Sequence, residues 1–187
     1  LYNSILDDDP LCGEVFLDRA KHYIRSCEWV AALGDFSTAA ALGRGDANVY
    51  NDIGVCYFEM RQHAQALEFF GKALELDPRH APSWSNRANC LKNLCKLEEA
   101  DADYTQAIEI DNTNPKAFLS RALLREGMGQ RVQALTDFQS VINLQSQHEL
   151  ALKKVLSLSS DPTENAHLKG WLHKRGHVNP SYQKRYF

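Results

Sequence analysis

The stretch "ALELDPRHAPSWSNRA", residues 73–88, ends one helix-like segment and begins another within a few residues. Proline is excluded from helix interiors because it lacks an amide hydrogen and its ring clashes with the preceding turn. Pro78 therefore marks the end of one helix, and Pro82 suits the first turn of the next. We predict two consecutive helices here, joined by a tight turn.

The composition indicates an ordinary globular protein. The 187 residues are 44% hydrophobic and 24% charged. No apolar run approaches the roughly 20 residues needed to cross a bilayer, and the first ten residues lack the basic and apolar regions of a signal peptide. The five cysteines show no paired spacing and favour reduced thiols. We predict a cytoplasmic protein.

A period of 34 residues organises most of the chain. Stepping by this period from Trp84 returns an aromatic residue every time, and four further columns repeat a small or an aromatic residue. The columns are Phe16, Tyr50, Trp84 and Phe118; Ala20, Gly54, Ala88 and Ala122; Ala32, Ala66, Ala100 and Ala134; Phe36, Phe70, Tyr104 and Phe138; and Ala39, Ala73, Ala107 and Val141. Such columns let two antiparallel helices approach closely at the small residues and pack around the aromatic ones.

This pattern closely resembles the tetratricopeptide repeat. The resemblance covers four motifs, residues 13–46, 47–80, 81–114 and 115–148. It implies an all-α fold, a right-handed superhelical solenoid of antiparallel helix pairs. The column of Pro78 reads Arg44, Asn112 and Ser146 in the other motifs, and the column of Tyr23 and Tyr57 continues with other residue types, Leu91 and Arg125.

The two ends of the array depart from the period. Carried backward, the frame makes residues 1–12 the second half of a truncated repeat. Carried forward, it places Leu152, Val155 and Leu156 at helical spacing, so we predict a capping helix at 149–160 that covers the last repeat. The periodicity stops before residues 161–187.

The tail at 161–187 differs from the array in charge. From Ser160 onward there are five Lys and Arg against two acids, whereas the preceding residues hold 16 basic and 22 acidic side chains. The tail resembles the first β-hairpin of a pleckstrin homology domain, which implies a phosphoinositide head-group site in a longer parent chain. The residues implicated are Lys174, Arg175, Lys184 and Arg185. The alternative is a basic, solvated tail, either hairpin-like or disordered.

No arrangement of residues points to catalysis. The seven histidines are scattered, none belongs to an HExxH motif, and no glycine-rich phosphate loop is present. We therefore predict no enzyme activity, no catalytic residues, no cofactor and no metal site. The acidic array also disfavours nucleic acid as a partner, because it would repel a phosphate backbone.

The resemblance places function on the first helices of successive repeats, which in this family line a concave groove for a partner peptide or helix. Asparagine is common at the inward positions, and its amide can pair with both the N–H and the C=O groups of an extended peptide. The alternative is that asparagine is only a tolerated polar residue there. The predicted groove residues are Asn48, Asn51, Asp52, Val55, Ser85, Asn86, Asn89, Asn93, Lys116, Ser120 and Leu123.

We predict a non-catalytic scaffold that binds a partner protein in this groove. One alternative is a membrane-targeted adaptor that uses the lipid-binding domain begun by the tail. Another is a co-chaperone that grips an acidic chaperone tail through a carboxylate clamp, but only Asn86 and Lys116 match that clamp, and its other positions carry Asn51, Val55 and Ser120. The oligomeric state is left open.

Overall fold

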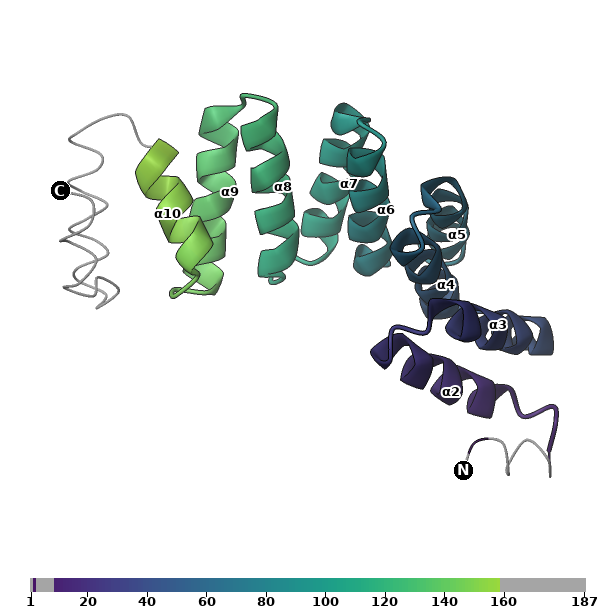
Figure 1. Cartoon of the computed structure of the whole chain (residues 1–187). Coiled ribbons are helices and arrows are strands. Elements are labelled where there is room, and N and C mark those ends of the chain that lie inside the picture. The colour runs from purple at the N-terminus through teal and green to yellow at the C-terminus, as the bar shows by residue number, and fades with distance from the viewer. Residues whose placement is uncertain (1, 3–8, 159–187) are drawn as a thin grey trace. The chain divides into compact units, whose positions relative to one another are not determined.

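The computed structural model describes Tyr2 and residues 9–158, and the prediction of an all-α fold is confirmed there: helices form this part, and it contains no strand (Figure 1). The chain divides into two compact units, residues 1–111 and 112–187. The helices of the first unit are α2 (Gly13–Arg25), α3 (Trp29–Ala39), the π-helix η1 (Ala40–Arg44), α4 (Ala47–Glu59), α5 (His63–Leu76), α6 (Ala81–Asn93) and α7 (Leu97–Ile110). Those of the second unit are α8 (Pro115–Gly127), α9 (Arg131–Leu144) and α10 (Glu149–Leu158).

Consecutive helices pair as hairpins, α2 with α3, α4 with α5, α6 with α7, and α8 with α9 (Figure 1). Within the first unit, α3 packs on α4 and α5 on α6, so each hairpin stacks on the next. In the second unit α10 packs on α9, and Ala151 and Val155 join the core cluster of that unit. The architecture is a helical solenoid.

The repeated columns form the core. The small column of the first helices and all three columns of the second helices are buried in every motif. The aromatic column of the first helices is only partly buried. In three motifs an arginine side chain covers its ring, with Arg87 lying 4.6 Å from the centre of the Trp84 ring.

Gly54 is the one glycine in the small column, and the structure explains why. A Cβ atom added there would lie 2.6 Å from the Phe70 ring, which is 1% exposed. We expect Gly54→Ala to lower the free energy of unfolding by about 1–3 kcal/mol through overpacking. Gly71→Ala is the control, since a Cβ on α5 at that position meets no atom within 4 Å. Urea unfolding followed by circular dichroism compares them, and equal midpoints would contradict the predicted clash.

The turns inside the hairpins also repeat. Cys27, Arg61, Cys95 and Gly129, each 34 residues apart, all have positive φ angles, of 58°, 63°, 60° and 76°. The residue after each donates its backbone N–H to a carbonyl five residues earlier, as Gln62 does to Tyr57 at 2.9 Å. A left-handed residue therefore ends every first helix, although only the last motif uses glycine.

The junction at Pro78 is held by its neighbours. α5 ends at Leu76, and Trp84 Nε1 donates a hydrogen bond of 2.9 Å to the Pro78 carbonyl. The first motif has Arg44 in the proline column, and there the second helix runs on as η1 until Gly43 adopts a φ of 80°. A left-handed glycine thus replaces proline as the helix stop.

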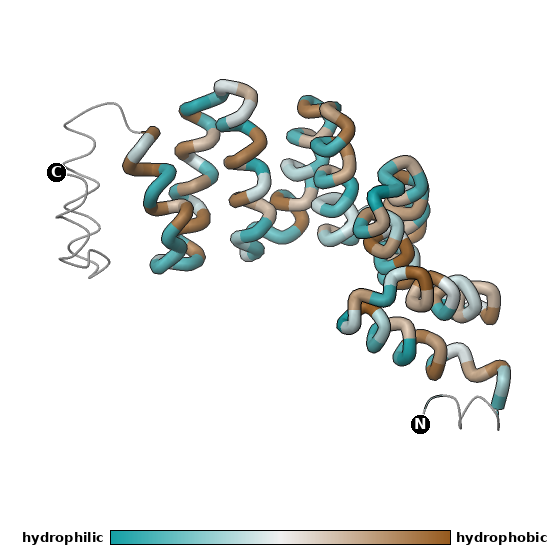
Figure 2. Tube along the Cα trace, in the orientation of Figure 1, coloured by the Kyte–Doolittle hydropathy of each residue, from teal (hydrophilic) through white to brown (hydrophobic). Residues whose placement is uncertain are grey.

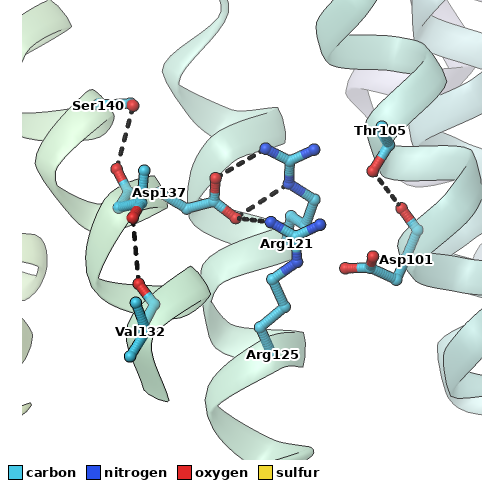
Figure 3. A network of polar contacts seen from close by, with 8 residues as sticks. Asp101, Thr105, Arg121, Arg125, Val132, Asp137 and Ser140 are labelled. Atoms are coloured by element: carbon cyan, nitrogen blue, oxygen red, sulfur yellow. Dashed lines mark hydrogen bonds and ion pairs between the residues drawn. The ribbon is translucent and has the colours of Figure 1, made fainter. Parts of the chain in front are cut away.

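An ion pair links the two helices of three hairpins at positions 16 residues apart. Arg19 bonds Asp35 and Arg87 bonds Asp103, each through two hydrogen bonds of 2.6–2.8 Å. Arg121 bonds Asp137 in the same way, and Arg125 adds a third bond of 3.0 Å (Figure 3). The aspartates are 6%, 6% and 2% exposed. The second motif has a hydrophobic pair at these positions, Ile53 and Phe69.

Hydrophilic and hydrophobic residues are interspersed along the described helices (Figure 2). None of the helices that the structure describes combines the length and the hydrophobicity needed to span a membrane. Of the predicted half repeat at 1–12, Tyr2 and residues 9–12 are described, and the Tyr2 ring lies 6.1 Å from the ring of His22 on α2.

Candidate polar binding face

The predicted asparagines of the first unit gather on α4 and α6. Asn48 lies four residues before Asp52 on α4, so these two side chains share one side of that helix. Asn86, Asn89 and Asn93 are three and four residues apart and share one side of α6. α4 and α6 contact each other directly. We call the set Asn48, Asp52, Asn86, Asn89 and Asn93 the polar face. Each of these side chains is exposed or partly exposed.

Asn51 differs from the expectation that it contacts a ligand, because its side chain is buried at 8% exposure. Its Oδ1 accepts hydrogen bonds from Asn86 Nδ2 at 2.9 Å and from Ser83 Oγ at 3.3 Å. Its Nδ2 donates to Asp52 Oδ1 at 3.3 Å. Asn51 therefore links α4 to α6 and orients two members of the polar face from beneath.

His80 extends this network at the start of α6. One ring nitrogen lies 2.7 Å from Ser83 Oγ and the other 3.1 Å from Asn48 Oδ1. His80 stands in the column of Asp46 and Asn114, which cap α4 and α8 by accepting backbone N–H groups. At this junction the residue in the capping position instead links α6 to α4.

Asn89 is held from α7. The Tyr104 hydroxyl, on a side chain with 0% exposure, donates a hydrogen bond of 2.6 Å to Asn89 Oδ1. The other three motifs have phenylalanine at the Tyr104 position and Lys21, Val55 or Leu123 at the Asn89 position. Tyrosine and asparagine thus occur together in one motif, where each satisfies the other. The bond uses the Asn89 oxygen, and the amide hydrogens have no hydrogen-bond partner among the described residues.

Asn89→Ala is expected to lower the free energy of unfolding by about 1–3 kcal/mol, because it removes the acceptor of the 2.6 Å hydrogen bond from the buried Tyr104 hydroxyl. The double variant Asn89→Val/Tyr104→Phe reproduces the pair of the second motif, Val55 and Phe70, and is expected to recover most of the loss. Urea unfolding of the wild type, both single variants and the double variant measures this coupling. Additive losses would show that the two side chains do not depend on each other.

Asp52 is the half-buried carboxylate of the polar face. Burial raises its pKa, against the opposing effects of the Asn51 hydrogen bond and the positive charge of Lys21 on α2. Within residues 9–158 no Lys, Arg or His forms an ion pair with it. Burial therefore makes the charged form of this carboxylate less favourable than it is in water.

The other predicted groove residues fall into separate groups. Val55 packs against the core cluster of Ala66, Phe70 and Cys90, and Ser85 is partly buried on α6. Three belong to α8 of the second unit: Lys116 and Leu123 are exposed, and Ser120 is partly buried. The predicted lipid-binding residues all lie outside the described residues: Lys174, Arg175, Lys184 and Arg185.

Sequence reasoning missed His80, Ser83 and Tyr104. For Ser83 and Tyr104 the available signal was a polar residue in an otherwise apolar column. Ser83 stands where the other motifs have Val15, Val49 and Ala117. Tyr104 likewise replaces phenylalanine. An exception of this kind marks a place where the repeat does something besides packing.

Two features limit the chemistry of the described part. Burial raises the pKa of the Cys56 and Cys90 thiols to about 12, so both stay protonated and unreactive at neutral pH. No three His, Cys, Asp or Glu side chains of the described residues come together as a metal site. The polar face therefore offers hydrogen bonds and one carboxylate.

Comparison with known proteins fits this geometry. The family model described as "Tetratricopeptide repeat" matches residues 47–80 and 81–114, the motifs that contribute α4–α7. Residues 47–114 are two tetratricopeptide repeats. The matched boundaries coincide with the second and third predicted motifs, which carry the whole polar face. The family-model matches do not reach the tail, and so they give no support to a pleckstrin homology-like segment there.

Relatives and solved structures extend the likeness. The bovine (Bos taurus) BBSome complex member BBS4 is 29% identical over 165 residues, which cover 85% of this chain and 29% of that protein. The TPR domain of Arabidopsis OM64 is 29% identical with a TM-score of 0.57, covering 60% of this chain and 93% of that one. MamA shares the fold at 21% identity and a TM-score of 0.71, over 78% and 85% of the two chains. The chain spans less than a third of the length of the curated relatives it matches.

Proposed function

We propose that the chain is a non-catalytic interaction scaffold that binds an extended segment of a partner protein across the polar face. One observation carries this proposal: internal hydrogen bonds fix the amides of Asn86 and Asn89 but leave part of each amide for a ligand. Amides held in place lose little conformational entropy on binding. They can donate to and accept from a peptide backbone of any sequence.

Two further points support the proposal. The relatives include a protein named as part of an assembly, the BBSome complex member BBS4. The network of Asn48, His80, Ser83, Asn51 and Asn86 also exceeds what helix packing requires, because the fourth motif packs the same columns with an alanine at the Ser83 position. Its expected role is to present the polar face in one arrangement.

Selection from a library of random twelve-residue peptides displayed on phage tests the proposal. An enriched peptide, synthesised with a fluorescent label, is then titrated with the 187-residue chain by fluorescence polarisation. We expect Asn86→Ala/Asn93→Ala to raise Kd at least fivefold and Gln106→Ala/Gln133→Ala, exposed on α7 and α9, to leave it unchanged. Circular dichroism confirms that all variants are helical. Equal Kd values for the asparagine variant and the wild type would refute binding at the polar face.

A further inference from the structure

We infer that the partner segment carries a lysine or arginine side chain, which pairs with Asp52 of the polar face. This inference rests on the proposed function and adds the chemistry of the ligand to it. The asparagine amides of the polar face suit the backbone of an extended peptide. Asp52 is the charged group of the face, so it is expected to contact one side chain of that peptide.

A chain of hydrogen bonds fixes the position of the Asp52 carboxylate. Asn51 donates to its Oδ1 at 3.3 Å, and Asn51 is itself fixed by Asn86 and Ser83. Three bonded residues from two helices thus determine where the carboxylate lies. A carboxylate can accept about four hydrogen bonds, so Asp52 retains capacity for a guanidinium or ammonium group.

Asp52 has no ion-pair partner among the described residues, unlike the buried aspartates of the ion-pair hairpins. The Asp residues of the three ion-pair hairpins, Asp35, Asp103 and Asp137, are each bonded by an arginine of the neighbouring helix. Among the described residues no cation forms an ion pair with Asp52, and burial raises its pKa even though Lys21 and His80 oppose this effect. A ligand cation would supply the missing partner and would remove the cost of keeping this half-buried group charged.

The position of Asp52 is acidic or neutral in the first helices of the first unit. Stepping by 34 residues through Asp52 gives Asp18 on α2 and Asn86 on α6, so this position holds two carboxylates and an amide. Asp18 is exposed. A row of this sign attracts a basic segment and repels an acidic tail.

The test uses the same phage library with two baits, the wild-type chain and its Asp52→Asn variant. We expect the wild type to enrich peptides with lysine or arginine at one aligned position and the variant to lose this preference. For the best peptide, Asp52→Asn should raise Kd about tenfold or more, whereas Glu98→Gln, an exposed acid on α7, should change Kd less than twofold. Asp52→Asn removes a charge that burial disfavours, so the variant is expected to unfold no more easily than the wild type.

A double-mutant cycle completes the test. Replacing the basic residue of the peptide by norleucine should weaken binding to the wild type by the same factor as Asp52→Asn, with no further loss when both changes are combined. Enriched peptides without a basic residue that still depend on Asn86 and Asn93 would overturn this inference and leave the proposed function standing. Failure of any peptide to be enriched on the wild type would overturn both.

Discussion

Asp137→Ala is expected to lower the free energy of unfolding by about 3–5 kcal/mol, which exceeds the losses expected at Gly54 and Asn89. Asp137 is 2% exposed and accepts hydrogen bonds from Arg121 and Arg125, whose side chains are 11% and 16% exposed. Removing the carboxylate abolishes all three of these hydrogen bonds to two largely buried guanidinium groups, and breaking a buried ion pair by removing one partner is costly. Urea unfolding followed by circular dichroism gives the change in midpoint.

An exposed ion pair supplies the control for this prediction. Glu68 and Lys72 form an i, i+4 pair on α5, with side chains 61% and 43% exposed. Glu68→Ala is expected to cost no more than about 0.5 kcal/mol, because water screens the pair. Equal midpoints for Asp137→Ala and Glu68→Ala would contradict the view that the buried ion pair holds α8 against α9.

The second large effect concerns the same pair in the third motif. Asp103→Ala is expected to lower the free energy of unfolding by about 2–4 kcal/mol, less than Asp137→Ala, because Arg87 is 28% exposed and keeps some contact with water. The chain itself offers a replacement, since the second motif fills these positions with Ile53 and Phe69. Phe69 stacks on the Tyr57 ring at a centroid distance of 5.2 Å.

The double variant Arg87→Ile/Asp103→Phe is therefore expected to recover at least half of the stability lost in Asp103→Ala. Replacing a buried ion pair by well-packed apolar residues is often neutral or stabilising. In the third motif the new phenylalanine would meet Leu91 at the position of Tyr57. The midpoint of urea unfolding decides the matter. A double variant less stable than Asp103→Ala would show that the two motifs are packed too differently for the exchange.

The core could be predicted from the sequence because one rule repeats. A residue that must be small or aromatic for packing is so in every motif, and comparison of four motifs exposes it without a second sequence. The four columns predicted for close packing are buried throughout the described residues. The aromatic column of Trp84 is the partial exception, because its rings are only partly buried and an arginine side chain covers three of them.

The arginine and aspartate columns of the ion pairs were not recognised in the sequence, although they follow the same 34-residue period. Arg19, Arg87 and Arg121 recur at 34-residue steps, and so do their aspartates, but the second motif interrupts both columns. Arg125, which departs from the tyrosine column, also has a physical reason once the structure is known. It bonds Asp137 as a second arginine. The charge that replaces the tyrosine is thus paired with an aspartate of the neighbouring helix.

The candidate site was less predictable, because it depends on contacts between helices that the period does not encode. The pattern identified Asn51 and Asn86 together, but only the three-dimensional arrangement reveals that one is buried and orients the other. His80 shares a polar column with Asp46 and Asn114 and so did not stand out, whereas Ser83 stood out only as the one polar residue of its column. Packing is a property of the repeat, whereas the polar face is a property of one junction between motifs.

The most direct test of binding at the polar face is a nuclear magnetic resonance titration of the ¹⁵N-labelled chain with the selected peptide, following side-chain amide signals. Asparagine and glutamine NH₂ groups report individually on both kinds of helix. We predict that the signals of Asn86, Asn89 and Asn93 shift while those of Gln106 and Gln133, on the second helices α7 and α9, stay in place. Shifts confined to Gln106 and Gln133 would place the partner on the second helices and contradict the account.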